Sequence, residues 1–203
     1  TGEASEVDPW LDRYAFDREV DVAGLAHPVY YATDPGLAIA PTGIGKAAAA
    51  TTVAALAAGE AVDLADATIL SVGIAGCRPA AGTLGSVFVA DRIVDWDVKL
   101  RIGDTTDRMQ WLADDYVWQL DEDLVDRAVG AAREASLADS DRAAEIRERY
   151  ADSRTPTVDV GPTVCGDEVY HGTATARQVD ALCESYGVDG FATTQMEDAG
   201  TAT

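Results

Sequence analysis

Short apolar runs alternate with longer, periodically apolar segments along most of this chain. Apolar runs at 28–32 and 37–41 flank an Asp-Pro-Gly turn signal at 34–36, a pattern that predicts a hairpin of two short strands. The alanine-rich segment 46–59 is almost free of charge and predicts a helix whose small residues pack tightly against a sheet. The first quarter of the chain is therefore expected to fold as a hairpin followed by a helix.

The rest of the chain continues the alternation of strands and helices. Apolar runs predict four further strands, of which the second is long and curved, at 67–72, 86–98, 157–164 and 190–194. Helical patterning covers 121–150 and 174–186, whereas 101–118 places Trp among Asp and Gly and predicts an irregular excursion. This alternation predicts an α/β fold with a mostly parallel sheet covered by helices on both faces.

Composition limits the class of protein. The chain has 203 residues with 47% apolar content, enough to bury a sizeable core as a single domain. It contains no continuous apolar run of about 20 residues, the length that a membrane-spanning helix needs. We therefore expect a soluble domain that does not itself span a bilayer.

The charge is strongly acidic. The chain carries 36 Asp and Glu against 15 Lys and Arg, a net charge of −21, and its only lysines are Lys46 and Lys99. Nucleic acid is thereby an unfavourable partner, because phosphate binding depends on cationic side chains. The acids are scattered through amphipathic stretches, which indicates a solvated acidic surface. We expect a cytoplasmic protein of a high-salt organism, where ions screen the self-repulsion within about 3 Å at 1 M salt. The chain begins without Met, so a missing leader says little about the compartment.

The cysteines and histidines do not form a recognisable metal or disulfide pattern. Cys77, Cys165 and Cys183 are odd in number and lack Cys-x-x-Cys spacing, and only His27 and His171 could join them. Neither a disulfide framework nor a zinc site is indicated. We expect no metal and no cofactor.

Two glycine loops that follow predicted strands are candidates for anion and ligand binding. In the first, Gly43 and Gly45 precede Lys46 at a helix start, where backbone N–H groups can hold an anion that offsets a cation in the first turn. The alternative is a tight turn with a solvated lysine. The second loop, 73–76, comprises Gly73, Ile74, Ala75 and Gly76. It lets a planar ligand approach the backbone, or else it packs strand against helix.

Two later loops contain side chains that are candidates for direct contact with a ligand. The loop 165–172 holds Tyr170, which can stack on a heterocycle, and His171, which can donate to it; alternatively, this histidine is merely solvated. Met196 and Glu197 follow the last predicted strand at the rim where α/β sheets bind ligands, a position suited to gripping a sugar diol. The alternative for this acid is an ordinary helix N-terminal carboxylate.

Taken in order, these loops resemble a known family. The sequence runs Pro-Thr-Gly-Ile-Gly-Lys, Gly-Ile-Ala-Gly, Gly-Asp-Glu-Val-Tyr-His-Gly and Gln-Met-Glu-Asp, and it also has Val-Asp-Pro-Trp at 7–10 and Asp-Trp-Asp at 95–97. This set is similar to the nucleoside phosphorylase and nucleosidase superfamily, and within it to the purine nucleoside permease branch, over nearly the whole chain.

The resemblance implies a mixed central sheet with flanking helices and a purine nucleoside held across the strand ends. It implies cleavage of the N-glycosidic bond by phosphate, as a possible co-substrate, or by water. For the sugar, the resemblance implies that Glu197 accepts hydrogen bonds from the ribose hydroxyls and that Met196 packs on the ring. For the base, it implies that Val169, Tyr170 and His171 cover the purine. It also implies that the amides of Gly43, Gly45 and 73–76 line the phosphate and ribose end, and that Glu6 is an acid of the catalytic loop.

The chain departs from the superfamily pattern in ways that change what the resemblance implies about phosphate binding and about the length of the protein. Phosphorylases usually carry a hydroxyl residue where this chain has Ile74, which weakens direct phosphate binding. The chain also begins after the superfamily's first strand and stops soon after Glu197, so we expect a longer parent protein. The superfamily implies a homo-oligomer. Two functions remain open: an enzyme that cleaves purine nucleosides, and a non-catalytic nucleoside-binding protein that supports uptake.

The acidic composition generates a prediction about salt. We expect the fold to be more stable in molar KCl than in dilute buffer, because screening relieves the repulsion among the acidic side chains. Thermal unfolding followed by circular dichroism in the two buffers measures the difference. Equal stability in both would rule out adaptation to high salt.

Overall fold

A computed structural model describes residues 6–59, 62–109, 116–135, 137, 141–169 and 172–202. The chain forms two compact units. The first contains residues 1–74 together with 196–203, and the second contains residues 75–195. The C-terminal segment therefore belongs to the same unit as the N-terminal third of the chain.

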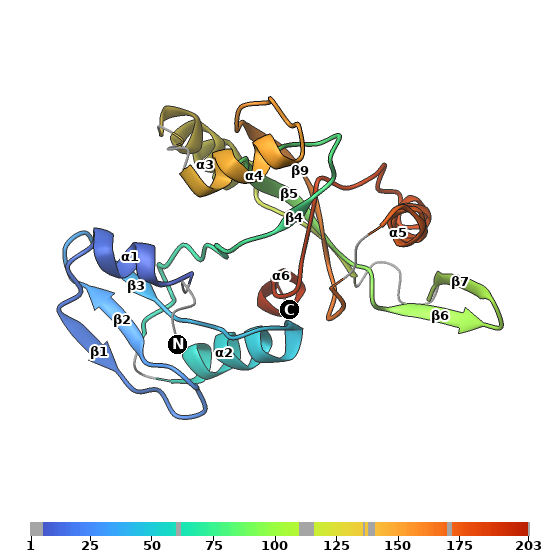
Figure 1. The fold of residues 1–203 in the computed structure, drawn as a ribbon. Helices are drawn as coiled ribbons and strands as arrows, with labels where there is room; N and C mark the ends of the chain where they lie inside the picture. The colour runs from blue at the N-terminus through green and yellow to red at the C-terminus, as the bar shows by residue number, and fades with distance from the viewer. Residues whose placement is uncertain are drawn as a thin grey trace. The chain divides into compact units, whose positions relative to one another are not determined.

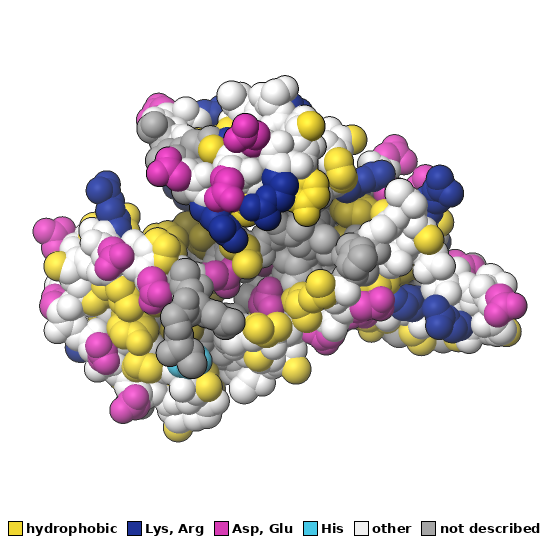
Figure 2. Space-filling model, viewed as in Figure 1, with side chains coloured by type: hydrophobic (Ala, Val, Ile, Leu, Met, Phe, Trp, Pro, Cys, Tyr) yellow, Lys and Arg dark blue, Asp and Glu magenta, His cyan; other side chains and the backbone are white. Residues whose placement is uncertain are grey.

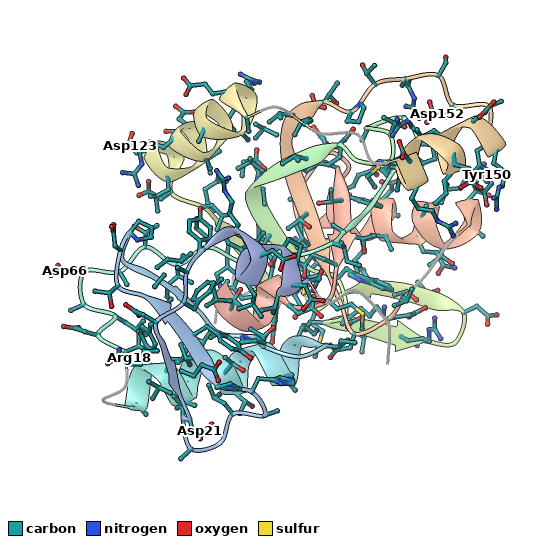
Figure 3. All side chains as sticks on the ribbon, turned by 60° about the vertical axis from the view of Figure 1, so that its left-hand side comes forward. Arg18, Asp21, Asp66, Asp123, Tyr150 and Asp152 are labelled. Carbon is teal, nitrogen blue, oxygen red and sulfur yellow. The ribbon has the colours of Figure 1, made fainter. Side chains whose placement is uncertain are left out.

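An antiparallel three-stranded sheet forms part of the first unit (Figure 1). Its strands, in the order β1-β2-β3, are β1 Arg18–Val20, β2 Val29–Ala32 and β3 Leu37–Ile39. Strands β2 and β3 are the predicted hairpin, with Tyr30 opposite Ile39. Strand β1 was not predicted, because Arg-Glu-Val has no apolar alternation. It is held by pairing with β2 and by the Arg18 guanidinium, which lies 4.2 Å from the centre of the Tyr31 ring (Figure 3).

Three helices complete the first unit: α1 Asp8–Arg13, α2 Lys46–Ala58 and α6 Asp198–Ala202. Helix α2 is the predicted alanine-rich helix, with Ala49 fully buried. Helix α6 packs on the first turn of α2 (Figure 1). The contact is so close that a Cβ atom at Gly200 would overlap the carbonyl oxygen of Lys46. Small residues on both helices allow this approach.

The second unit is built on a five-stranded mixed sheet in the order β4-β10-β9-β5-β8. Its central pairings, β10 with β9 and β9 with β5, are parallel, and both edge strands are antiparallel. The strands are β4 Gly76–Cys77, β5 Val87–Asp95, β8 Val117–Gln119, β9 Val158–Cys165 and β10 Thr193–Gln195. The long strand β5 changes register against β9 between Ala90 and Ile93, which agrees with the predicted curvature.

Helices α3 Glu122–Glu134, α4 Asp141–Arg149 and α5 Thr173–Ser185 accompany this sheet. Helix α3 packs against β5 and β9. The main core of the unit joins α5 to the sheet, with Val94 and Val164 from the strands and Val179 and Cys183 from the helix all fully buried. The chain is therefore a mixed α/β protein, as its alternating pattern predicts.

Some predicted elements differ from the structure. The run 67–72 forms no ladder among the described residues and leaves Leu70 67% exposed, because apolar β-prone residues become a strand only where a partner lies alongside. Within the expected excursion, β6 Lys99–Ile102 and β7 Thr105–Arg108 form a hairpin, with Gly103 supplying the positive φ of 59° in its turn. Residues 110–115 lie outside the described part.

Within the part of the chain that the structure describes, no helix combines the length and the apolar character needed to cross a bilayer.

The contact between α6 and α2 generates a stability prediction. Gly200→Ala should lower the free energy of unfolding by about 1–3 kcal/mol, because the added methyl group must displace the backbone of Lys46. The control is Gly130→Ala in α3, where a Cβ meets nothing within 4 Å and should stabilise the helix by about 0.5–1 kcal/mol. Chemical denaturation measures both. Equal effects of the two substitutions would show that the packing of α6 on α2 is not close.

Candidate functional site

The candidate site begins at the N-terminus of α2. Gly43 and Gly45 both adopt positive φ, at 78° and 96°, so the chain can turn sharply into the helix at Gly45. The carbonyl group of Gly45 accepts the N–H of Ala49 and closes the first helical turn. This geometry exposes the preceding N–H groups as donors for an anion.

A carboxylate of the chain itself takes that position. The N–H of Gly45 donates to Glu197 Oε1 at 2.9 Å, and the N–H of Met196 donates to Glu197 Oε2 at 3.2 Å. Each carboxylate oxygen thus accepts one backbone hydrogen bond, which fixes the plane of the group. A carboxylate can accept about four hydrogen bonds, which is why this residue type suits a ligand with several hydroxyl groups.

The position of Glu197 explains the cation in the first turn of α2. Lys46 is the first residue of the helix, where a positive charge opposes the helix dipole. The carboxylate of Glu197 at the preceding amide offsets that cost. The sequence predicts an anion at this helix start, and in the structure the Glu197 carboxylate lies at the Gly45 amide.

A second carboxylate meets a second glycine loop. The N–H of Ile74 donates to Glu6 Oε1. A Cβ atom at Gly73 would lie 3.0 Å from the same oxygen, so the absence of a side chain there lets Glu6 approach. The side chain of Ile74 itself is 85% exposed. This loop therefore binds an acid through its backbone and presents an apolar side chain outward.

A third carboxylate, that of Asp198, links the segment of the second glycine loop to the segment that carries Glu197. Ser71 Oγ donates to Asp198 Oδ1 at 2.6 Å, which links the segment before Gly73 to the residue after Glu197. Burial raises the pKa of Asp198 above its ordinary value, the Ser71 hydrogen bond opposes that rise, and the charge of Glu197 adds to it. The proton affinity of Asp198 therefore depends in part on the charge of Glu197, its neighbour on the chain.

These contacts gather part of the predicted site within one unit. In the first unit, Gly45 contacts Glu197 and Ile74 contacts Glu6. Of the other predicted residues, Gly43, Lys46, Gly73 and Met196 belong to the same unit. Ala75, Gly76 and the 83% exposed Val169 belong to the second unit, and Tyr170 and His171 lie outside the described residues. The functional roles of all these residues stay predictions.

Sequence analysis did not single out Ser71 or Asp198 as site residues. Asp198 follows Glu197 directly in the sequence, but no sequence pattern distinguishes it from the other acidic residues. Ser71 was a lone hydroxyl in an apolar run that predicted a strand. A polar residue inside such a run is the signal that could have indicated it.

A hollow in the second unit is lined by none of the predicted site residues. It has a volume of about 560 Å³, and its lining includes Cys77, Arg154, Tyr150 and Asp152, the last two of which are labelled in Figure 3. Arg154 donates to both carboxylate oxygens of Asp152 at 2.9 and 2.7 Å, which lowers the pKa of Asp152. The lining also includes Arg147, which donates to the carbonyl oxygen of Leu84 at 2.8 Å, so the charged side chains of the hollow are two arginines and one aspartate.

Acidic side chains are spread over the visible face of the protein, with few basic ones among them on the first unit (Figure 2). In the described ranges, no three His, Cys, Asp or Glu side chains are grouped as metal ligands would be. The three cysteines are free thiols.

Comparison with known proteins identifies the family of this chain. The sequence model of the family described as purine nucleoside permease matches residues 3–115 and 105–203. The chain belongs to the purine nucleoside permease family. A relative in Schizosaccharomyces pombe, described as a probable purine nucleoside permease, is 29% identical over 238 residues, a match that covers 98% of this chain and 67% of the relative.

Solved structures show that this permease-family chain shares the fold of nucleoside-cleaving enzymes. Futalosine hydrolase of Helicobacter pylori aligns with a TM-score of 0.61 at 17% identity, over 97% of this chain and 72% of that one. The 5'-methylthioadenosine/S-adenosylhomocysteine nucleosidase of Neisseria meningitidis aligns with a TM-score of 0.62 at 18% identity, over 98% and 75%. The corresponding nucleosidase of S. pneumoniae gives 0.61 at 18%, over 98% and 74%. At these identities the likeness concerns the fold.

The raised pKa of Asp198 generates a prediction about pH. Because its folded-state pKa lies above the ordinary value, ionising Asp198 costs stability, and this cost grows as the pH rises from about 4 through the folded pKa. Asp198→Asn should therefore gain stability relative to the wild type as pH rises. The asparagine can still accept the Ser71 hydrogen bond.

The matched control is Asp12→Asn on the exposed face of α1, which removes the same charge. Denaturant unfolding at several pH values measures both variants. If the stability of Asp198→Asn relative to the wild type changes with pH in the same way as that of Asp12→Asn, the burial of Asp198 has no energetic consequence.

Proposed function

We propose that this protein binds a purine nucleoside and cleaves its N-glycosidic bond, by phosphorolysis or hydrolysis. The observation that carries the proposal is the Glu197 carboxylate, held by the N–H groups of Gly45 and Met196. A carboxylate whose plane is fixed before the ligand arrives can accept two neighbouring sugar hydroxyls without further ordering cost. The half-buried Met196 beside it supplies an apolar contact for the sugar ring.

Electrostatics supports cleavage at this site. Breaking an N-glycosidic bond builds positive charge on the ribose, so preorganised negative groups stabilise the transition state more than the substrate. Glu6 and Glu197 lie in the same unit and are each held by backbone N–H donors. A backbone amide orients a carboxylate without adding a positive charge, which suits an acid that faces developing positive charge on the sugar.

The base-binding part of the proposal rests on the resemblance in sequence. Val169, Tyr170 and His171 belong to the loop that we propose covers the purine. The exposed side chain of Val169 is compatible with a ligand contact. An aromatic ring at Tyr170 would add stacking on the heterocycle.

The name of the family supports a second candidate. Both the family and its yeast relative are described as purine nucleoside permeases, so a non-catalytic nucleoside-binding protein that serves uptake is the alternative. Release of free base from inosine or adenosine separates the two. Tight nucleoside binding without any base release would refute the proposed cleavage and favour the alternative.

The placement of the ribose generates a prediction that holds for either function. Glu197→Gln should weaken nucleoside binding at least about 10-fold, because hydrogen bonds from the sugar hydroxyls to a charged acceptor are replaced by bonds to a neutral one. Glu19→Gln, an exposed acid on β1 in the same unit, is the control and should leave binding unchanged. Calorimetric titration with inosine measures both. An unchanged affinity in Glu197→Gln would refute the ribose contact.

A further inference from the structure

The Asp-Trp-Asp sequence at 95–97 lies against the loop that we propose covers the purine. Strand β5 ends at Asp95, which pairs with Cys165 at the end of the parallel strand β9. Beyond that pair, the N–H of Trp96 donates to the carbonyl oxygen of Cys165 at 3.1 Å. The residues that follow the two strands therefore leave the sheet side by side. We call the residues after β9, 166–169, the base loop.

An acid of this sequence accepts a hydrogen bond from the base loop. The backbone N–H of Asp167 donates to Asp97 Oδ2. The N–H of Asp97 itself donates to Asp95 Oδ1 at 3.0 Å, and Asp95 is 6% exposed, so a buried acid holds the backbone that carries the acceptor. A hydrogen bond to a charged acceptor contributes more than one between neutral groups. Asp97 is thus a strong acceptor, held in place for an amide of the base loop.

Close packing adds a second contact at the start of the base loop. A Cβ atom at Gly166 would overlap Trp96 Nε1 and would lie 2.9 Å from Asp97 Cγ, so this position has no room for a side chain. Trp96 is 4% exposed and belongs to the main core of the second unit. The base loop therefore packs on a buried ring at Gly166 and is hydrogen-bonded to Asp97 at the next residue.

Lys99 joins the two side chains that contact the base loop. Its Nζ atom lies 3.6 Å from the centre of the Trp96 ring and 3.8 Å from Asp97 Oδ1. The side chains of Lys99 and Asp97 are only 22% and 24% exposed. Partly buried charges are screened less by salt than exposed ones, and an ammonium group binds a ring more strongly when it is desolvated. The cation therefore restrains both the ring and the carboxylate.

From these contacts we propose that Asp97 is a positioning residue for nucleoside binding, which holds the base loop so that Val169 is presented to the purine. This inference rests on the proposed function. Val169 lies two residues after the Asp167 amide, and its side chain is 83% exposed. An exposed side chain binds a ligand at lower entropic cost when its backbone is already restrained. Asp97 acts through the loop and does not itself touch the ligand.

Hydrogen exchange tests the restraint without any ligand. Asp97→Ala should raise the exchange rate of the base-loop amides at least about 10-fold, because it removes the acceptor of the Asp167 N–H. Asp104→Ala, an exposed acid in the turn between β6 and β7, is the matched control and should leave these rates unchanged. Mass spectrometry of peptides that cover the loop measures both variants. Unchanged exchange in Asp97→Ala would overturn its role in holding the loop.

A double-mutant cycle tests whether Asp97 acts through Val169. With folding checked by circular dichroism, Asp97→Ala should weaken inosine binding about 10-fold. Val169→Ala should weaken it about 3-fold in the wild type but not further in Asp97→Ala, because the side chain is no longer presented. Calorimetric titration with inosine measures all four proteins. Additive effects of the two substitutions, or an unchanged affinity in Asp97→Ala, would overturn the positioning role.

The conservative variant separates the hydrogen bond from a general loss of structure. Asp97→Asn keeps an oxygen acceptor for the Asp167 amide, so its inosine affinity should stay within about 3-fold of the wild type. An affinity as low as that of Asp97→Ala would overturn the hydrogen bond as the cause. If the wild-type protein binds neither inosine nor adenosine, the proposed function is refuted and the role of Asp97 in nucleoside binding with it. The exchange experiment still reports in that case whether Asp97 holds the loop.

Discussion

The hydrogen bond from the Gly45 N–H to Glu197, 2.9 Å long, joins residues 152 positions apart, and the candidate site depends on it. It places an anion at the start of α2, where Lys46 alone would oppose the helix dipole. It also accompanies the packing of α6 on α2, which brings the C-terminal segment into the first unit. The same contact therefore supports a helix start, the packing of two helices and the orientation of the acid that we propose binds the sugar.

The way in which this protein holds its acids follows from its composition. With 36 acidic residues against 15 basic ones, most carboxylates cannot pair with a cation. Among the described contacts of the candidate site, backbone N–H groups donate to Glu6 and Glu197, and the Ser71 hydroxyl donates to Asp198. In the second unit, Arg78 pairs with Asp180. Neutral donors orient an acid and leave its charge in place. A site that must stabilise positive charge on a sugar benefits from that arrangement.

The second unit holds the five-stranded sheet of the fold. Two parallel pairings at the centre of its sheet bury Val94 and Val164, and α5 covers them with Val179. Thr163 and Thr193 on neighbouring strands join their hydroxyls at 2.9 Å inside this layer, so each of these two buried hydroxyls has a hydrogen-bond partner. The family carries the name of a permease, yet the chain shares its fold with proteins described as nucleosidases.

Periodicity and turn residues, which act locally, were enough to predict the α/β class, the hairpin of β2 and β3 and the helix after Gly45. The roles of Glu197 and of the loop at Lys46 stay predictions. The fold was needed to show that Gly45 donates to Glu197, Ile74 to Glu6 and Ser71 to Asp198. It also decided that the apolar run at 67–72 forms no strand in the described residues. Partners distant in sequence leave no local pattern, since hydrogen bonds and strand pairing depend on which segments the fold brings together.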